Sequence, residues 1–241
     1  QEDLSRISTS IQSLIAKVEI GKKLQNNVLK MFKELGATYV AVRGSTSIKD
    51  KPLVYFDGRI ATSLNVKEES LLSNIEYCWA SLYSSRCLEY IFDEDMVNEV
   101  IHVAVVVQQM VDAEVSGICY TVDPYGKKNV IIIEAGWGLG EAIVSGIISP
   151  DRYIVDKETL KVADFTVGMQ LKEVTREEQR HKIIDVPKKK QQARKITDEQ
   201  VSELARLVSQ VEEYYGAPQQ LEWAFDNDLF SILQARRIPG K

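Results

Sequence analysis

The chain has 241 residues, 44% of them hydrophobic and 27% charged, with a formal net charge of −5. This composition excludes an intrinsically disordered chain, and the negative charge argues against nucleic acid as a partner. The longest apolar stretch, residues 130–150, contains two glutamates and several glycines, which argues against a membrane helix. The first residues lack the basic and apolar regions of a signal peptide, so we expect a cytoplasmic protein.

The cysteines show no pattern of a metal site. Cys78, Cys87 and Cys119 all lie in apolar or amphipathic runs, and their spacing does not fit a set of metal ligands. We therefore expect three buried free thiols in a reducing compartment.

The chain begins with two predicted helices that lead into a strand. Apolar residues recur at helical spacing over residues 4–17 and again over 28–35, where Gly36 is a plausible C-terminal cap. The short β-type run 38–42 then delivers Arg43 into a loop rich in hydroxyl groups. This arrangement predicts an α/β protein.

Strands and helices continue to alternate up to residue 111. Residues 53–64 are typical of a strand pair broken at the hairpin dipeptide Asp57-Gly58. Helical spacing follows over residues 71–83, with Asn65 as a possible cap. The valine-rich run 100–111 predicts a buried central strand.

The second half predicts mainly antiparallel strand pairs. The expected elements are strands over 114–121 and 130–133, a glycine-rich turn and short helix over 134–146, a hairpin over 152–167, and a helix over 197–215. That helix opens with a capping box formed by Thr197 and Gln200. Residues 171–195 are highly charged, and we interpret their lysine run 188–190 as a solvated loop rather than a phosphate site. The glycine turn lacks the spacing of a dinucleotide-binding motif, and we interpret it as a structural connection rather than a phosphate cradle.

The last stretch of the chain predicts a β-hairpin with one polar face. Two apolar-rich runs flank a polar turn over residues 226–228. A three-residue loop centred on Asp228 would set Glu222 opposite Gln234, with Arg236 diagonal to Glu222 on the same face. Carboxylate and amide oxygens are ligands of Mg²⁺, and an arginine beside them suits a phosphate. The alternative is a solvent-facing strand with a surface ion pair.

Four motifs taken together resemble one family. They are Val40–Arg43 with its Ser/Thr loop, Val107–Val111 with Glu114–Gly117, Trp137–Glu141 leading to Ser145-Gly146 and Ser149–Asp151, and Leu221–Trp223 with Leu233–Arg236. The chain resembles the ATP-grasp-type ATP-binding domain of phosphoenolpyruvate synthase, pyruvate phosphate dikinase and rifampicin phosphotransferase. The resemblance implies an α/β (α+β) fold in which two subdomains, residues 1–110 and 111–241, clamp Mg-ATP with mainly antiparallel sheets.

The resemblance also implies a site and a reaction. By position, the site residues are Arg43 and Arg236 for the phosphates, Gly58 and Thr62 near the nucleotide, Gln108, Gln109 and Val111 for adenine, and Glu222 and Gln234 for Mg²⁺. The β-phosphate would pass to a histidine on a separate swivelling domain and then to pyruvate or another acceptor. Metal and guanidinium groups suit this chemistry because they offset the charge that develops during phosphoryl transfer.

The chain departs from the family pattern at several points. Gly44 stands where the family has a serine, and Gln220 stands where it commonly has an aspartate. Nothing here matches the family's preceding glycine-rich segment with its phosphate-binding lysine. The unmatched segment and Gln220 favour one alternative, a non-catalytic regulatory or partner-binding module. A second alternative is the ATP domain of an antibiotic phosphotransferase, because the choice of acceptor lies outside this chain. Arg43 could also pair with Asp50, and we interpret both histidines, at positions 102 and 181, as structural.

Overall fold

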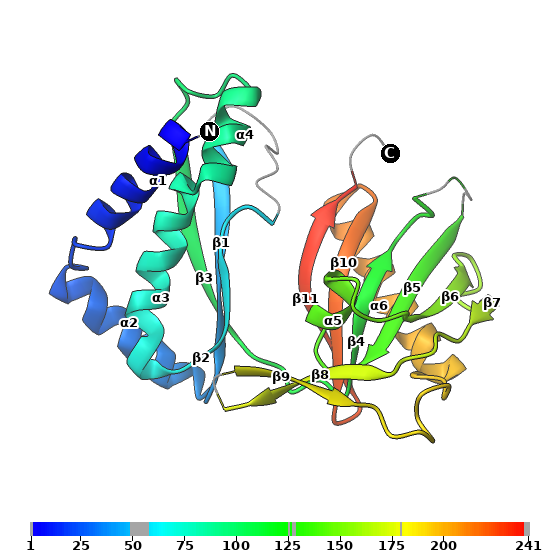
Figure 1. The fold of residues 1–241 in the computed structure, drawn as a ribbon. Coiled ribbons are helices and arrows are strands. Elements are labelled where there is room, and N and C mark those ends of the chain that lie inside the picture. The colour runs from blue at the N-terminus through cyan, green and yellow to red at the C-terminus, as the bar shows by residue number, and fades with distance from the viewer. Residues whose placement is uncertain (1, 49–57, 125, 127–128, 179, 239–241) are drawn as a thin grey trace. The chain divides into compact units, whose positions relative to one another are not determined.

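The computed structural model describes residues 2–48, 58–124, 126, 129–178 and 180–238 (Figure 1). The chain divides into two compact units, Gln1–Met110 and Val111–Lys241, which we call the first and the second unit. The expected α/β class with mainly antiparallel sheets is confirmed. In the described part of the chain, no helix combines the length and the apolarity needed to cross a bilayer.

The first unit is a three-stranded antiparallel sheet with helices on one of its faces (Figure 1). Its elements are α1 (Glu2–Ile15), α2 (Lys22–Leu35), β1 (Val40–Ile48), β2 (Thr62–Val66), α3 (Glu68–Ala80), the short 3₁₀ helix η1 (Ser81–Tyr83), α4 (Ser85–Asp93) and β3 (Ile101–Gln109). The strand order is β2-β1-β3. The predicted helices are confirmed, and α2 ends at Gly36, whose φ of 66° places it in the left-handed region.

Three expectations for the first unit were wrong. Residues 44–47, expected as a hydroxyl-rich loop after Arg43, belong to β1 and pair with β3. The valine-rich run is not a central strand, because β1 occupies the middle of the sheet and β3 lies at its edge. Val106 is accordingly 47% exposed, while Val105 and Val107 pack against the helices. Asn65 does not cap α3, whose N-cap is Lys67. Asn65 lies in β2 with a φ of 57°, where the β1–β2 register shifts by one residue.

The core of the first unit lies between its sheet and the helices. Val40 and Val42 of β1 pack with Phe32 of α2 and with Leu71 and Ile75 of α3. Side chains alternate between the two faces of a strand, so the intervening residues of β1 point away from the helices. One face of this sheet is therefore built for packing, and the other carries the polar residues that are described below. The expected first strand of the 53–64 pair lies outside the described residues.

The second unit is a six-stranded antiparallel sheet in the order β11-β10-β4-β5-β6-β7. Its elements are β4 (Val115–Tyr120), β5 (Val130–Trp137), α5 (Glu141–Val144), β6 (Asp151–Asp156), β7 (Val162–Thr166), β8 (Lys172–Glu177), β9 (Arg180–Asp185), α6 (Asp198–Tyr215), β10 (Gln219–Asp226) and β11 (Leu229–Arg237). The capping box of α6 is confirmed, because Thr197 Oγ1 accepts from Gln200 N at 3.3 Å while Gln200 Oε1 accepts from Thr197 N at 2.9 Å.

The charged segment 171–195 holds two strands that were not predicted from the sequence, while its lysine run 188–190 lies in an exposed turn, as expected. It contains the antiparallel hairpin β8–β9. Gly138 bridges to Val174, and the Leu139 N–H donates to the Val174 carbonyl at 2.8 Å, which fastens the hairpin to the glycine turn. The sequence shows no alternation of apolar and polar residues here, because only Val174 on β8 is buried.

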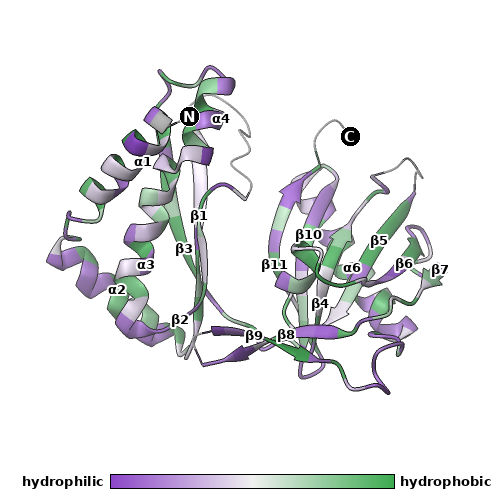
Figure 2. Cartoon of the chain, in the orientation of Figure 1, coloured by the Kyte–Doolittle hydropathy of each residue, from purple (hydrophilic) through white to green (hydrophobic). Residues whose placement is uncertain are grey.

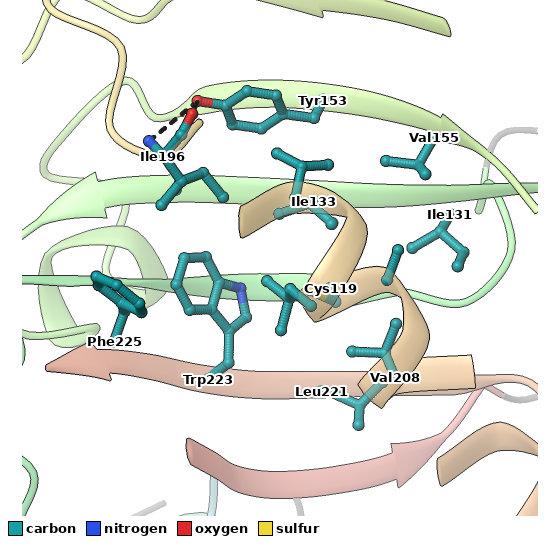
Figure 3. Packing of buried hydrophobic residues seen from close by; sticks show 14 of the residues in the cluster. Cys119, Ile131, Ile133, Tyr153, Val155, Ile196, Val208, Leu221, Trp223 and Phe225 are labelled. Carbon is teal, nitrogen blue, oxygen red and sulfur yellow. Dashed lines mark hydrogen bonds between the residues drawn. The ribbon is translucent and has the colours of Figure 1, made fainter. Parts of the chain in front are cut away.

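The main core of the second unit lies between α6 and one face of its sheet. Leu221 and Trp223 of β10 meet Cys119 of β4, Ile133 of β5 and Val208 of α6 in this core (Figure 3). Figure 2 shows β5 green, that is hydrophobic, along most of its length, as expected for a strand buried in the core. The alternate residues of β10, β4 and β5 consequently face away from α6.

A fully buried ion pair, missed in the sequence, joins two segments of this unit. Lys195 Nζ lies 2.8 Å from Asp151 Oδ1 and donates to the Gly168 carbonyl at 2.8 Å. The Asp151 carboxylate also accepts from the Lys195 and Gly168 N–H groups, both at 2.9 Å, and from the Tyr153 hydroxyl at 3.0 Å. The Tyr153 oxygen in turn accepts from the Ile196 N–H at 3.5 Å (Figure 3). The network ties the chain before α6 to β6.

The three cysteines are buried free thiols, as expected. Burial raises the pKa of Cys78 to about 11, raises that of Cys87, and raises that of Cys119 well above its ordinary value. The folded chain holds these thiol protons more tightly than the unfolded chain does. The resulting contribution to the free energy of unfolding is fully present below pH 9.0, the ordinary pKa of a thiol, and it is lost as the pH rises towards 11.

We expect an aromatic disulfide reagent at pH 8 to leave the three thiols of the native protein unmodified and to modify all three after unfolding in guanidinium. The urea midpoint should fall as the pH rises from 9 towards about 11, because ionisation of the thiols favours the unfolded chain. Rapid modification of the native protein at pH 8, monitored by absorbance, would show that the thiols are accessible and would contradict this assignment.

Candidate functional site

The C-terminal hairpin β10–β11 places Glu222, Gln234 and Arg236 on one face. Glu222 pairs directly with Gln234, and Gln220 pairs with Arg236, so Arg236 lies diagonal to Glu222. Leu221 and Trp223 face α6, which places Glu222 on the opposite face of the sheet. Directly paired residues have Cβ atoms about 5 Å apart. A Glu222 carboxylate oxygen and the Gln234 amide oxygen are therefore close enough to bind one cation.

The turn that produces this pairing differs from the expected one. The loop has two residues, Asn227 and Asp228, rather than three. Both have positive φ angles, 49° and 60°, as a type I′ turn requires. Asn and Asp are the non-glycine residues that tolerate this conformation best. A regular hairpin on this turn would set Leu233 opposite Glu222.

A β-bulge restores the expected pairing. Trp223 pairs with Ile232 while Glu222 pairs with Gln234, so Leu233 is an extra residue on β11. Without the bulge, Gln234 would point towards α6, and its amide would be out of reach of the Glu222 carboxylate. The bulge therefore reverses which residues of β11 face each side of the sheet beyond Leu233, and it places the amide of Gln234 on the polar face.

A second polar set lies on the first unit, on the sheet face that the helices leave open. Arg43 pairs with Thr62 on β2, and Gln108 pairs with Ala41 two residues before Arg43. Since Val42 faces the helices, Arg43, Thr62 and Gln108 share the opposite face. Gln109 does not share this face: it pairs with Val40, so it lies on the sheet face that the helices cover.

The remaining predicted residues of the first unit lie outside the strands or at their ends. Gly58 is an exposed turn residue with a φ of 65°, and its carbonyl accepts from Arg86 Nη1 at 3.2 Å. A Cβ on Gly58 would meet no atom within 4 Å, so its left-handed backbone, rather than crowding, favours glycine. Val111 is the first residue of the second unit. Asp50, the alternative partner of Arg43, lies outside the described residues.

The structure explains the glycine that replaces a serine after Arg43. Gly44 pairs with Val105, on the face that the helices cover. A Cβ there would lie 2.0 Å from Cγ2 of Ile60 and 3.2 Å from Sγ of Cys78. A serine hydroxyl would thus enter the core of the first unit, on the side away from the Arg43 guanidinium. Ile60 fills the space instead.

The glycine turn after β5 is bound into the fold. Gly138 donates its N–H to the Glu114 carbonyl at 3.0 Å, and its φ is 82°. The buried Gln170 side chain accepts from Trp137 N at 2.8 Å and donates to Trp137 O at 3.0 Å. These bonds use backbone groups that a phosphate cradle would need, so they favour the structural interpretation. His181 contacts the Glu141 carboxylate at the start of α5.

The donor set fits a hard cation that brings oxygen ligands of its own. Within the described residues, no group of three or more His, Cys, Asp or Glu side chains could hold a metal. Glu222 and Gln234 together offer one carboxylate and one amide oxygen. Mg²⁺ is commonly bound by one or two protein oxygens together with water and substrate phosphates. A metal-nucleotide complex therefore matches this face better than a free ion.

Comparison with known proteins identifies the family. Residues 1–240 match the model described as pyruvate phosphate dikinase, AMP/ATP-binding domain. The chain is 37% identical over 98% of its length to a protein of Methanothermobacter thermautotrophicus named "Probable phosphoenolpyruvate synthase". It is 34% identical over 99% of its length to the phosphoenolpyruvate synthase of Pyrococcus furiosus, and 33% identical over 99% to the rifampicin phosphotransferase of Bacillus subtilis.

The match covers only part of each relative. The chain spans 36%, 31% and 28% of the lengths of these three proteins. The relatives therefore contain regions to which nothing in this chain corresponds. The part that does correspond extends over nearly all of the chain, and it includes both units and the C-terminal hairpin. The chain belongs to the family of the AMP/ATP-binding domain of pyruvate phosphate dikinase.

Proposed function

We propose that this chain binds Mg-ATP and serves as the ATP-binding part of a dikinase-type phosphotransferase. The observation that carries the proposal is the pairing of Glu222 with Gln234, with Arg236 diagonal to Glu222 on the face away from α6. Glu222 and Gln234 bind the Mg²⁺ of the nucleotide, and Arg236 contacts its phosphates. When bound, the metal supplies positive charge to the phosphate oxygens.

The first unit contributes the remaining contacts in this proposal. Arg43 binds the triphosphate, since a guanidinium can donate two parallel hydrogen bonds to phosphate oxygens. Thr62 and Gly58 lie beside the nucleotide. Gln108 contributes to adenine binding, and Gln109 and Val111 contribute through their backbone groups. The shared face of Arg43, Thr62 and Gln108 supports this assignment.

The phosphate leaves this chain in the complete reaction that we propose. The β-phosphate of ATP passes to a histidine on a separate swivelling domain, and from there to pyruvate, which forms phosphoenolpyruvate. The names of the two synthase relatives support pyruvate as the acceptor. The rifampicin phosphotransferase relative supports a second candidate, an antibiotic acceptor. Both candidates use the same Mg-ATP site, because the choice of acceptor depends on regions that this chain does not contain.

The site assignment is tested by isothermal titration calorimetry of ATP in the presence of Mg²⁺. We expect Glu222→Gln and Arg236→Ala each to weaken binding by about 10- to 100-fold, since each removes a charge-assisted interaction worth about 1.5–3 kcal/mol. The matched control is Arg237→Ala, because the exposed Arg237 pairs with Gln219 on the other face of the hairpin. Unchanged affinity in both site variants would refute the assignment.

A further inference from the structure

A second carboxylate lies on the same sheet face as Glu222, two strands away. Glu222 on β10 pairs with Ile118 on β4, and Ile118 pairs with Glu134 on β5. The neighbours of Glu134 along β5, Ile133 and Ala135, belong to the core that faces α6. Glu134 therefore points to the opposite face, where Glu222 and Gln234 also lie.

The distance between the two carboxylates suits a hydrated cation. Adjacent strands are about 4.8 Å apart, which places the Cα atoms of Glu222 and Glu134 about 10 Å from each other. Both side chains are long enough to reach inward over Ile118. Mg²⁺ keeps several water molecules at about 2.1 Å when proteins bind it. A carboxylate on the far side of the ion can accept a hydrogen bond from one of these waters.

The surroundings of Glu134 leave its carboxylate without a close partner. Within the described residues, this carboxylate makes no hydrogen bond and no ion pair within 4.0 Å, and the opposite charge that acts on it is that of Arg152, its pair on β6. Ile118, between the two glutamates, is only 8% exposed. Burial raises the pKa of Glu134 although the Arg152 guanidinium opposes the shift. Such a carboxylate is costly to ionise, and a nearby cation would offset that cost.

We propose that Glu134 is a third protein group of the Mg-ATP site, whose carboxylate accepts a hydrogen bond from a water molecule bound to the metal. The inference rests on the proposed function, and it adds a residue of β5 to the pair on the hairpin. It also gives the site a second negative charge although Gln220 is neutral. The two carboxylates then face the metal, while Arg236 faces the phosphates.

The competing role is a structural ion pair between Glu134 and Arg152, and the two roles predict opposite results for Glu134→Gln. If Glu134 acts on a water molecule bound to the metal, its half-buried carboxylate destabilises the unbound protein, so the variant should melt at the same temperature as the wild type or higher. As a structural ion pair, its removal should lower the melting temperature and leave the metal dependence unchanged. The variant keeps the size of the side chain, so packing is preserved in either case.

The test is calorimetric titration of ATP at a series of Mg²⁺ concentrations, with the wild type, Glu134→Gln, Glu222→Gln and the control Glu203→Gln, an exposed residue of α6. We expect Glu134→Gln to raise, by about 5- to 10-fold, the Mg²⁺ concentration at which the enhancement of ATP affinity is half-maximal. The ATP affinity of this variant in EDTA should be unchanged or tighter. Glu203→Gln should behave as the wild type.

Two results would overturn the inference in distinguishable ways. An unchanged metal dependence in Glu134→Gln, with a clear shift in Glu222→Gln, would retain the proposed function and exclude Glu134 from the site. A wild type that does not bind ATP in the presence of Mg²⁺ would refute the proposed function and this inference together. Melting temperatures of the unbound proteins complete the test, since a lower value for Glu134→Gln would assign the residue to the ion pair.

Discussion

Replacement of Lys195 by methionine is expected to lower the free energy of unfolding by about 3–5 kcal/mol. The Lys195 and Asp151 side chains are 0% and 1% exposed, and their charges neutralise each other at 2.8 Å. The methionine variant keeps the aliphatic packing but leaves the Asp151 carboxylate buried without a counter-charge. Urea unfolding followed by tryptophan fluorescence measures the effect, because the core tryptophan Trp223 lies in the same unit.

Two controls separate the ion pair from a general effect of losing a lysine. Lys189→Met removes an exposed lysine six residues away and should change the unfolding free energy by less than about 0.5 kcal/mol. The double variant Lys195→Met with Asp151→Asn should recover part of the loss, since no unpaired charge then stays buried. A loss below about 1 kcal/mol in Lys195→Met would contradict the buried network.

Replacement of Gly117 by alanine is expected to be at least as severe, at about 3 kcal/mol or more, at the upper end of overpacking effects. A Cβ at this position would lie 1.8 Å from the backbone oxygen of Glu134 and 2.7 Å from Cζ2 of Trp223. The carbonyl belongs to the neighbouring strand and Trp223 is only 1% exposed, so neither can move without disturbing the sheet or the core.

The matched control for this substitution is another glycine. Gly21→Ala should change the unfolding free energy by less than about 1 kcal/mol, because a Cβ there meets no atom within 4 Å and its φ is −56°. Circular dichroism and urea unfolding compare the two variants. A Gly117→Ala protein as stable as the wild type would show that β4 and β5 are not packed as described.

Local chemistry predicted many elements of this fold from the sequence. Gly36 and Gly216 end α2 and α6 in left-handed conformations, and Thr197 caps α6 through a pattern that depends only on neighbouring residues. The hairpin β10–β11 was predictable for the same reason, because its alternation and its polar turn are local. These signals act within a few residues of one another, and they can be recognised without tertiary contacts.

Features that depend on distant contacts were not predictable. Lys195 and Asp151 are 44 residues apart, and neither has a local pattern that marks it as buried. The valines of β3 gave no sign of an edge position, since strand order is a tertiary property. The pairing of Glu222 with Gln234 was expected from a three-residue loop, whereas it results from a two-residue turn and the bulge at Leu233. A bulge leaves no mark in the alternation of apolar residues.

Part of the candidate site was likewise predictable from local patterns, and part of it was not. Glu222, Gln234 and Arg236 were grouped by strand periodicity, and the remaining site residues came from the resemblance to the family. Glu134 escaped notice because its place on the same face as Glu222 arises from the pairing of β10 with β4, which lie far apart in the sequence, and of β4 with β5. The motif around Glu134 suggested a strand and a glycine turn, and it contained no signal for a metal.

The measurement that tests the central claim most directly is the affinity of the wild-type chain for ATP with Mg²⁺ and with excess EDTA. If Glu222 and Gln234 bind the metal of Mg-ATP, calorimetry should show binding that is at least about tenfold tighter with Mg²⁺, equivalent to about 1.4 kcal/mol. Equal affinity under the two conditions, or no binding in the presence of Mg²⁺, would contradict the claim.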